Sequence, residues 1–376
     1  MVEDDYYLDW AESGVRWLLN PLSTPLSRLA ADVAARTPRS ACDAALLLAE
    51  AELLYELIVE RHFGVATGRI PADLVRASIM EWAGVLESQS PATWGEAVTA
   101  LRDRLRDVLV DQHLEIRGAI PQTRRSLPPL DGDDGPAVEE RRVGDVLVLR
   151  IRRLIGAPSD EALLRSWAAD SDRHFDSARI IVDLRGNRGG NDGHTLDWAR
   201  RRLGRIEHFA RDWTWTVGGK ALGNWNAAAW RQARDGVKSV PPRLLDGRHH
   251  PAPSDRLEID ADEAGTIASG DLMWSGRMVV LVDPETKSSG ESSAWLLKRG
   301  LGATLVGART CGMIEYGNIV PYVMPRSGLV IDLPTKRNDF GIPVETVGFP
   351  VDVELDPRSR IEDVAASFDA LYRTGA

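Results

Sequence analysis

The segment from Met278 to Gly300 constrains the fold of this chain more than any other. It begins with a short, β-branched apolar run, M-V-V-L-V, which predicts a buried strand. A turn rich in proline, threonine, serine and glycine follows. The stretch from Glu291 to Arg299 then has the composition of a helix, with Gly300 as a stop signal. A strand that passes through a turn into a helix is typical of α/β proteins.

Two serines, Ser288 and Ser289, lie in this turn. A hydroxyl group there lies beside unpaired backbone N–H groups and the positive end of a helix dipole, which both stabilise developing negative charge. One interpretation is therefore a nucleophilic serine. The other is a serine that only caps the helix. The segment by itself leaves both open.

The composition excludes several classes of function. A net charge of −10 and a pI near 5.3 argue against a nucleic-acid partner or an anionic membrane. Cys42 and Cys311 lie far apart in the chain, so no disulfide framework and no cysteine-based metal site can be built from them. We expect no metal and no cofactor. Lysine occurs only at positions 220, 238, 287, 298 and 336, which leaves few candidates for a catalytic lysine.

The first ten residues, M-V-E-D-D-Y-Y-L-D-W, are acidic where a signal peptide would be basic and then apolar. No apolar run approaches the length that crosses a membrane. We therefore expect a cytoplasmic protein that does not engage a membrane.

The pattern of the chain changes once, which predicts two domains. Residues 1–118 have helical patterns, at Ala41 to Arg61, Pro71 to Glu87 and Ala92 to Val110 among others, which predict an N-terminal all-α domain. Residues 119–140 are rich in proline, glycine and aspartate and indicate a linker. Residues 141–376 alternate strands and helices, which predicts an α/β core.

The core has its own expected elements. An insertion rich in tryptophan, at about 205–275, interrupts its rhythm and is either a lid or an ordinary surface subdomain. The remaining expected strands are 145–155, 178–184 and 303–307, a hairpin spans 318–333, and the helices are 160–173, 194–203 and 361–372.

A serine nucleophile needs a base. Lys298 is too far along the helix to reach back, and Lys287 would point elsewhere. Histidine remains, and His113, beside Asp111 at the edge of the helical region, could face the core or be an ordinary surface histidine. The seven histidines are His62, His113, His174, His194, His208, His249 and His250.

The stretch D-L-R-G-N-R-G-G, from Asp183 to Gly190, could supply oxyanion donors, because glycines let backbone amides approach a substrate closely. The alternative is a tight turn that needs only positive φ angles. As a phosphate loop the stretch fits poorly, since no G-K-[ST] follows. Glu345, in V-E-T-V-G-F-P, could orient the base or be one more exposed glutamate.

Together, D-L-R-G-N-R-G-G, the S-S-G-E of Ser288 to Glu291, L-V-G-A-R-T-C-G and V-E-T-V-G-F-P-V-D resemble the S41 serine peptidases, the family of tail-specific and tricorn-type proteases. The resemblance covers residues from about 100 to 355. It implies a core of the ClpP/crotonase-like α/β kind. No PDZ domain is expected, since only the linker separates His113 from the first core strand.

The resemblance also assigns roles. The tail-specific branch has a lysine just after a T-x-G motif, where this chain has Met313. The tricorn-like branch uses serine and histidine, and Asp111-Gln112-His113 matches its D-x-H segment. The resemblance thus implies Ser288 as nucleophile, His113 as base and Glu345 as the assisting carboxylate. The implied oxyanion hole consists of the amide of Ser289 with that of Gly189 or Gly190.

Four functions remain open at this stage. The first is a serine peptidase acting on short or specialised peptides. The second is a peptide-maturation enzyme or macrocyclase that uses the same acyl-enzyme but lets an amine replace water. The third is a catalytically degenerate member that binds peptides. The fourth is an acyl-CoA enzyme of crotonase-like architecture, which would not need Ser288. The expected partner is a peptide, and a homo-oligomer is a family-level expectation.

Overall fold

The structure is a computed structural model that describes most of the chain between residues 51 and 374. Within that range it omits 52–53, 56, 60–61, 67, 89–93, 118–134, 156–157, 175, 204–212, 217–257, 260–273, 324–329 and 339. The expected helix over 41–61 and most of the linker and of the tryptophan-rich insertion therefore lie outside the described residues. The chain forms two compact units: 1–124 with 214–260 and 316–338, and 125–213 with 261–315 and 339–376.

The second unit is built on a six-stranded sheet in the order β11-β8-β7-β4-β3-β2. Neighbouring strands are parallel except for β2 and β3, which form an antiparallel hairpin at one edge. The strands are β2 Val138–Val143, β3 Val146–Ile151, β4 Arg179–Asp183, β7 Arg277–Val282, β8 Thr304–Gly307 and β11 Val353–Glu354.

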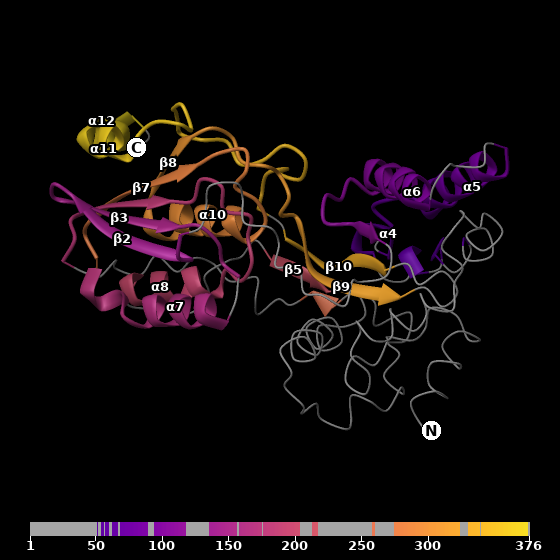
Figure 1. Cartoon of the computed structure of the whole chain (residues 1–376), viewed down its shortest axis with the longest axis horizontal. Helices are drawn as coiled ribbons and strands as arrows, with labels where there is room; N and C mark the ends of the chain where they lie inside the picture. The colour runs from indigo at the N-terminus through magenta and orange to yellow at the C-terminus, as the bar shows by residue number, and fades with distance from the viewer. Residues whose placement is uncertain are drawn as a thin grey trace, which may run out of the picture. The chain divides into compact units, whose positions relative to one another are not determined.

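Helices cover both faces of this sheet (Figure 1). On β7, Val280 and Val282 pack on one face, while Val279 and Leu281 pack on the other, as the two-residue period of a strand requires. The first face carries α7 (Pro158–Ala169), α8 (Gly193–Leu203) and α10 (Ser289–Leu301); the second carries α11 (Ile361–Ala366) and α12 (Phe368–Thr374). A short 3₁₀ helix, η1 (Ser171–His174), follows α7. Central strands that are buried on both faces explain the continuous apolar runs in the sequence.

The first unit combines helices with a sheet. Its helices are α4 (Phe63–Ala66), α5 (Ala72–Ser88) and α6 (Trp94–Leu109). Its five-stranded sheet contains β1 (Glu115–Arg117), β5 (Trp213–Thr216), β6 (Glu258–Ile259), β9 (Tyr316–Val323) and β10 (Val330–Asn338). Apolar side chains of α5, α6, β1 and β10 form one buried cluster, which holds the end of α6 against the sheet.

The expected mixed α/β fold is confirmed. The helices over 71–87 and 92–110 and the hairpin over 318–333 correspond to α5, α6 and the antiparallel pair β9–β10. The N-terminal all-α domain and the proposed domain bounds stay predictions, because residues 1–50 lie outside the described part of the chain. None of the helices that the structure describes is long and apolar enough to cross a membrane.

The strand β2 begins at Val138, within the predicted linker, and carries four successive charged residues, Glu139 to Arg142, at the edge of the sheet. Two boundaries of helices were predicted wrongly, for physical reasons. The helix after Ser288 does not stop at Gly300; it ends at Leu301 and is capped by Gly302, which adopts the left-handed conformation with φ 64°. The single closing helix is two, because the chain turns at Ser367 between α11 and α12.

Candidate active site

Ser288 has a strained backbone at the start of α10. Its φ and ψ angles are 52° and −126°, a conformation that residues other than glycine rarely adopt. Such a residue costs on the order of 1–3 kcal/mol and persists only where its surroundings enforce it. Here the N–H of Ser288 donates to the carbonyl of Met313 (3.0 Å) and to the carboxylate of Glu291 (3.1 Å). The turn is therefore held in place from two directions.

The loop after β4 lies against this turn. The N–H of Lys287 donates to the carbonyl of Asn187 (2.9 Å), and the hydroxyl of Thr286 donates to the carbonyl of Leu184 (3.0 Å). Asn187 also donates its side-chain amide to the carbonyl of Ile151 on β3 (2.9 Å). The glycine-rich stretch and the serine turn, about a hundred positions apart in the sequence, are thus parts of one structure.

Both glycines predicted for the oxyanion hole need to be glycine. Gly189 and Gly190 have φ angles of 95° and 136°. A Cβ atom on Gly189 would lie 2.8 Å from the Cβ of Ser288 and 2.9 Å from the amide nitrogen of Ser289. A Cβ on Gly190 would lie 2.3 Å from the carbonyl carbon of Leu154. The backbone of Gly189 is therefore in direct contact with the serine turn.

Two backbone N–H groups beside the serine turn are available to bind an oxyanion. The N–H of Gly189 already donates to the side-chain oxygen of Asn187 (2.8 Å). Within the described residues, no acceptor is present for the N–H groups of Gly190 and Ser289. The hydroxyl of Ser289 donates to the carbonyl of Gly190 (2.8 Å), which ties the two segments together. Of the two glycines, Gly190 is thus the one with a donor to offer.

Replacing Gly189 with alanine is expected to lower reactivity at Ser288 about 100-fold, because a displacement of about 1 Å at a reacting group has that order of effect. Labelling by a fluorophosphonate measures it. Gly144→Ala is the matched control, since Gly144 also has a positive φ (62°) but open space around its Cβ position. That variant should lose about 1 kcal/mol of stability and label normally. Equal labelling of both variants would contradict the prediction.

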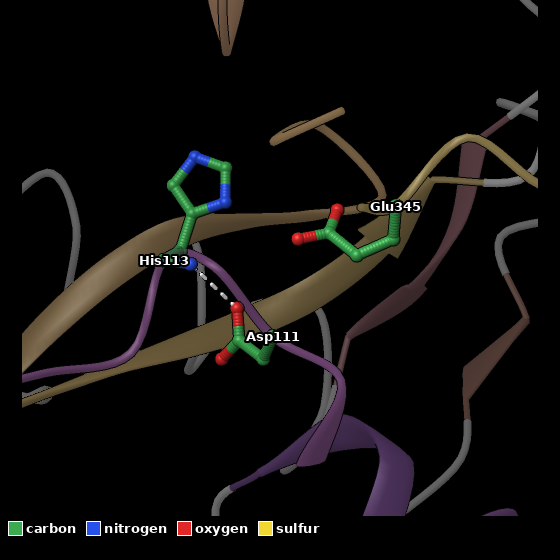
Figure 2. Close-up of side chains that lie close together, drawn as sticks. All are labelled: Asp111, His113 and Glu345. Atoms are coloured by element: carbon green, nitrogen blue, oxygen red, sulfur yellow. Dashed lines mark hydrogen bonds between the residues drawn. The ribbon is translucent and has the colours of Figure 1, made fainter. Parts of the chain in front are cut away.

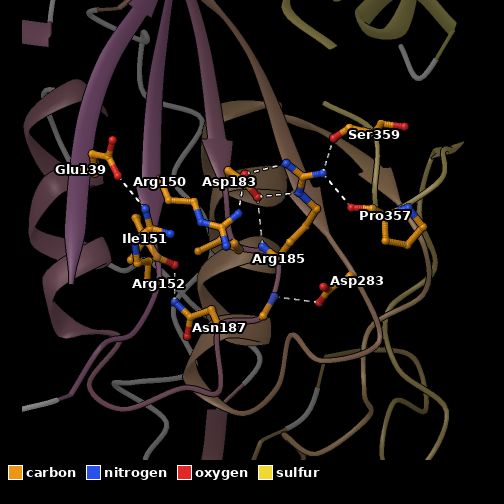
Figure 3. Close-up of polar contacts among 12 residues, drawn as sticks. Glu139, Arg150, Ile151, Arg152, Asp183, Arg185, Asn187, Asp283, Pro357 and Ser359 are labelled. Carbon is orange, nitrogen blue, oxygen red and sulfur yellow. Dashed lines mark hydrogen bonds and ion pairs between the residues drawn. The ribbon is translucent and has the colours of Figure 1, made fainter. Parts of the chain in front are cut away.

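A buried ion cluster anchors the glycine loop (Figure 3). Asp183, at the end of β4, accepts hydrogen bonds from the guanidinium groups of Arg150 (2.7 Å) and Arg185 (2.7 and 2.8 Å). Arg185 in turn donates to the carbonyls of Pro357 and Ser359 (2.7 and 2.8 Å). Burial alone would raise the pKa of Asp183, but the hydrogen bonds and charges of the two arginines outweigh it and hold that pKa below the ordinary 3.8.

This depressed pKa predicts an acid-sensitive contribution to stability. The unfolded chain binds the Asp183 proton more tightly than the folded chain does. The contribution of Asp183 to the free energy of unfolding is therefore present above about pH 4 and is lost as the pH falls below that value. Asp183→Asn should cost about 2 kcal/mol at pH 7, the scale of a hydrogen bond to a charged group. The difference in unfolding free energy between this variant and wild type should become smaller below pH 4. Urea unfolding at pH 7 and pH 3 tests this.

The control for that prediction is Asp145→Asn. The Asp145 side chain is 73% exposed and pairs with Arg179 on the surface, where ion pairs contribute little. Its effect should be within about 0.5 kcal/mol at both pH values. A cost for Asp183→Asn that is the same at pH 7 and pH 3 would show that its charge is not what matters.

Glu291 is a fully buried carboxylate under the serine turn. Its Oε1 accepts from the hydroxyl of Thr310 (2.5 Å) and the N–H of Gly312 (2.8 Å). Its Oε2 accepts from the N–H groups of Met313 (2.8 Å) and Ser288 (3.1 Å). Burial raises the pKa of Glu291 even though all four donors lower it. Sequence reasoning included Glu291 only as part of the S-S-G-E motif, and its structural role went unrecognised.

Glu345 is buried, not an exposed glutamate. Its carboxylate accepts from the N–H groups of Ile314 (3.0 Å) and Glu315 (2.8 Å). Glu315 reciprocates, because its carboxylate accepts from the N–H groups of Val344 (2.7 Å) and Glu345 (3.1 Å). Ile314 follows Met313, whose carbonyl binds the Ser288 amide, so a short backbone path joins Glu345 to the serine turn. Sequence reasoning missed Glu315, which no motif distinguishes.

His113 belongs to the other unit and lies in the turn between α6 and β1. Its side chain is buried. Its backbone N–H donates to the Oδ1 atom of Asp111 (2.8 Å), which gives the D-Q-H segment the closed form of an Asx turn (Figure 2). The Asp–x–His spacing therefore has a structural basis: the aspartate fixes the backbone of the histidine.

The second unit thus brings together the predicted residues Ser288, Ser289, Gly189 and Gly190, with Glu345 joined to them through the backbone after Met313. Within either unit taken by itself, the described residues contain no group of three histidine, cysteine or acidic side chains close enough to share a metal ion.

Comparison with known proteins gives a family match. The model of peptidase family S41 matches residues 148–341. Among solved structures, a lipoprotein from Streptococcus agalactiae is similar at 12% identity, with 86% of this chain and 96% of that chain covered and a TM-score of 0.46. The photosystem II D1 C-terminal processing protease is similar at 14% identity, 88% and 97% coverage and a TM-score of 0.47.

The tricorn protease is also similar, at 16% identity, with 62% of this chain and 18% of that chain covered and a TM-score of 0.32. A search of curated protein sequences found no match.

Proposed function

This chain belongs to peptidase family S41, and we propose that it is a serine peptidase that cleaves peptide bonds through an acyl-enzyme on Ser288, with His113 as general base. Members of that family are serine peptidases, so hydrolysis of peptide bonds is the activity to expect of the chain. The finer proposal concerns which residues act, in which order, and on what kind of peptide.

The strained conformation of Ser288 is the observation that carries the proposal. Helix-capping serines normally have extended backbones, whereas Ser288 has a φ angle of 52°. Strain of this kind is stored at functional sites, where it presents a side chain that an ordinary turn would not. The half-buried Ser288 also has the available amides of Ser289 and Gly190 in its surroundings. Ser288 is also the N-cap of α10 and forms a capping box with Glu291, but capping by itself would require neither feature.

In the proposed reaction, the imidazole of His113 takes the hydroxyl proton of Ser288 as Oγ attacks the carbonyl carbon of the scissile peptide bond. The amides of Ser289 and Gly190 stabilise the resulting oxyanion. The imidazolium then gives its proton to the leaving amine, the C–N bond breaks, and an ester on Ser288 remains. Water attacks this ester, giving a proton to His113, and the released Oγ recovers it.

We propose histidine rather than lysine as the base because of the residue at position 313. The family's alternative lysine would stand where this chain has Met313, whose backbone carbonyl binds the Ser288 amide. That position is therefore next to the nucleophile, but it carries a thioether that cannot take a proton. The buried carboxylate of Glu345 is proposed to assist the histidine. Short or specialised peptides are the proposed substrates, since no tail-recognition module is expected.

Labelling with a fluorophosphonate, followed by mass mapping of the adduct, tests the proposal. We expect one adduct, on Ser288, and a labelling rate about 1000-fold lower in His113→Ala, the scale on which loss of a catalytic base acts. Ser166→Ala is the control, because Ser166 is an exposed serine on α7, and it should label like wild type. A folded wild-type chain that does not label would favour peptide binding without catalysis.

A further inference from the structure

A second histidine lies behind the turn that carries His113. His62, immediately before α4, is fully buried, and its Nε2 atom lies 3.3 Å from the Oδ2 atom of Asp111, which is also fully buried. The other carboxylate oxygen of Asp111 accepts the backbone N–H of His113 (2.8 Å). Asp111 thus lies between the two histidines: it accepts a hydrogen bond from the backbone of His113 and stands at ion-pair distance from His62, without a hydrogen bond to it. No sequence motif singled out His62.

Burying a carboxylate is costly, and a buried polar pair contributes less to stability than apolar side chains of the same size would. An apolar pair would fit these surroundings, because the neighbouring cluster consists of leucine, isoleucine, valine, alanine and tryptophan. The His62–Asp111 pair therefore calls for a role other than stability. Through Asp111 the pair connects to the backbone of His113.

The same turn is held from its other side. The guanidinium of Arg106 donates to the carbonyls of Leu114 (2.8 Å) and Gln112 (3.3 Å), on both sides of His113. Val110, which opens the turn, has a φ angle of 49°, a strained value for a β-branched residue. Contacts from two directions and a strained first residue indicate a turn that is fixed more firmly than a connection between α6 and β1 requires.

From these contacts we infer that His62 is a positioning residue, which holds Asp111 so that Asp111 fixes the backbone, and thereby the imidazole, of His113. The inference rests on the proposed role of His113 as base. The carboxylate beside His62 also lies near the ring of His113, because one of its oxygens is within 4.8 Å of a ring nitrogen of that histidine. The other titratable groups around the turn are Arg106, Glu115 and Tyr316.

The position of the donor nitrogen provides the test. The amide nitrogen of glutamine replaces Nε2 of histidine, whereas that of asparagine replaces Nδ1 and leaves the Oδ2 atom of Asp111 without a nitrogen beside it. We therefore expect His62→Gln to label with fluorophosphonate within about 3-fold of wild type. His62→Asn and the apolar His62→Leu should label at least about 10-fold more slowly. His174→Gln, at another buried histidine paired with a glutamate, is the control and should label normally.

A spectroscopic readout separates this inference from the proposed function. With ¹³Cε1-labelled histidine, His113 should give one sharp signal in the wild type and in His62→Gln, and broadened or multiple signals in His62→Asn and His62→Leu. This holds even if the wild type does not label, which would overturn only the proposed function. If His62→Gln, His62→Asn and His62→Leu give the same labelling rate and the same His113 signal, the inference is overturned.

If a His62 variant does not fold, Asp111→Asn is tested in its place, because it keeps the side-chain volume of Asp111 but removes the charge of the carboxylate. The ring of His113 should then titrate about one pH unit lower, because a negative charge within 4.8 Å stabilises its protonated form. An unchanged titration of His113 in this variant would contradict the inference.

Discussion

Ser288→Gly is expected to abolish labelling by fluorophosphonates and, at the same time, to make the fold more stable. The loss of labelling is complete because no hydroxyl remains. The gain arises because a φ angle of 52° costs on the order of 1–3 kcal/mol for any residue with a Cβ, and nothing for glycine. The greater freedom of glycine in the unfolded chain offsets about 0.5–1 kcal/mol of that. A net gain of about 1 kcal/mol, or about 2 °C in Tm, should remain.

Ser288→Ala is the control that separates the two effects. Alanine also lacks the hydroxyl and should not label, but it keeps the Cβ atom and hence the strain. Calorimetry or urea unfolding of the two variants side by side therefore measures the strain itself. If Ser288→Gly is no more stable than Ser288→Ala, the strained backbone is not a property of the folded protein, and the main support for a nucleophilic serine is removed.

The sequence predicted the second unit best, because its central strands are apolar on both faces and each is followed by glycine, serine or proline. The turn before α10 and the glycine loop after β4 could be located for that reason. Their contact could not be predicted: it depends on Asn187, which joins two segments about a hundred positions apart by means of its backbone and its side-chain amide. No local pattern encodes such a connection.

The buried carboxylates were the hardest features to predict. Glu315 and Glu345 look like surface residues in the sequence, because each is a glutamate among mixed neighbours. Their burial depends on the reciprocal hydrogen bonds to each other's backbone, which exist only after residues 314–315 and 344–345 have come together. His62 was overlooked for the same reason, since α4, α5 and α6 separate it from its partner Asp111 in the sequence.

Glu291→Gln is expected to have the largest effect on stability of any isosteric change at this site. Both carboxylate oxygens of Glu291 accept two hydrogen bonds, but a glutamine side chain has one oxygen and one NH₂ group. Two of the four donors would then face the NH₂ group of the glutamine, which is itself a donor, in a site without solvent. Each unsatisfied buried group costs about 1–3 kcal/mol, so the variant should lose about 3 kcal/mol of unfolding free energy.

The labelling rate should fall together with the stability. In one orientation of the glutamine the N–H of Ser288 loses its acceptor, and in the other the N–H of Gly312, in the T-C-G segment, loses its acceptor. We expect a labelling rate about 100-fold lower at a temperature where the variant is folded. Glu285→Gln is the matched control: its side chain is 60% exposed and pairs with Arg188 on the surface, so both stability and labelling should stay near wild type. A Glu291→Gln chain with wild-type stability would mean that this carboxylate does not accept four hydrogen bonds, and that Ser288 is held in its strained conformation by Met313 alone.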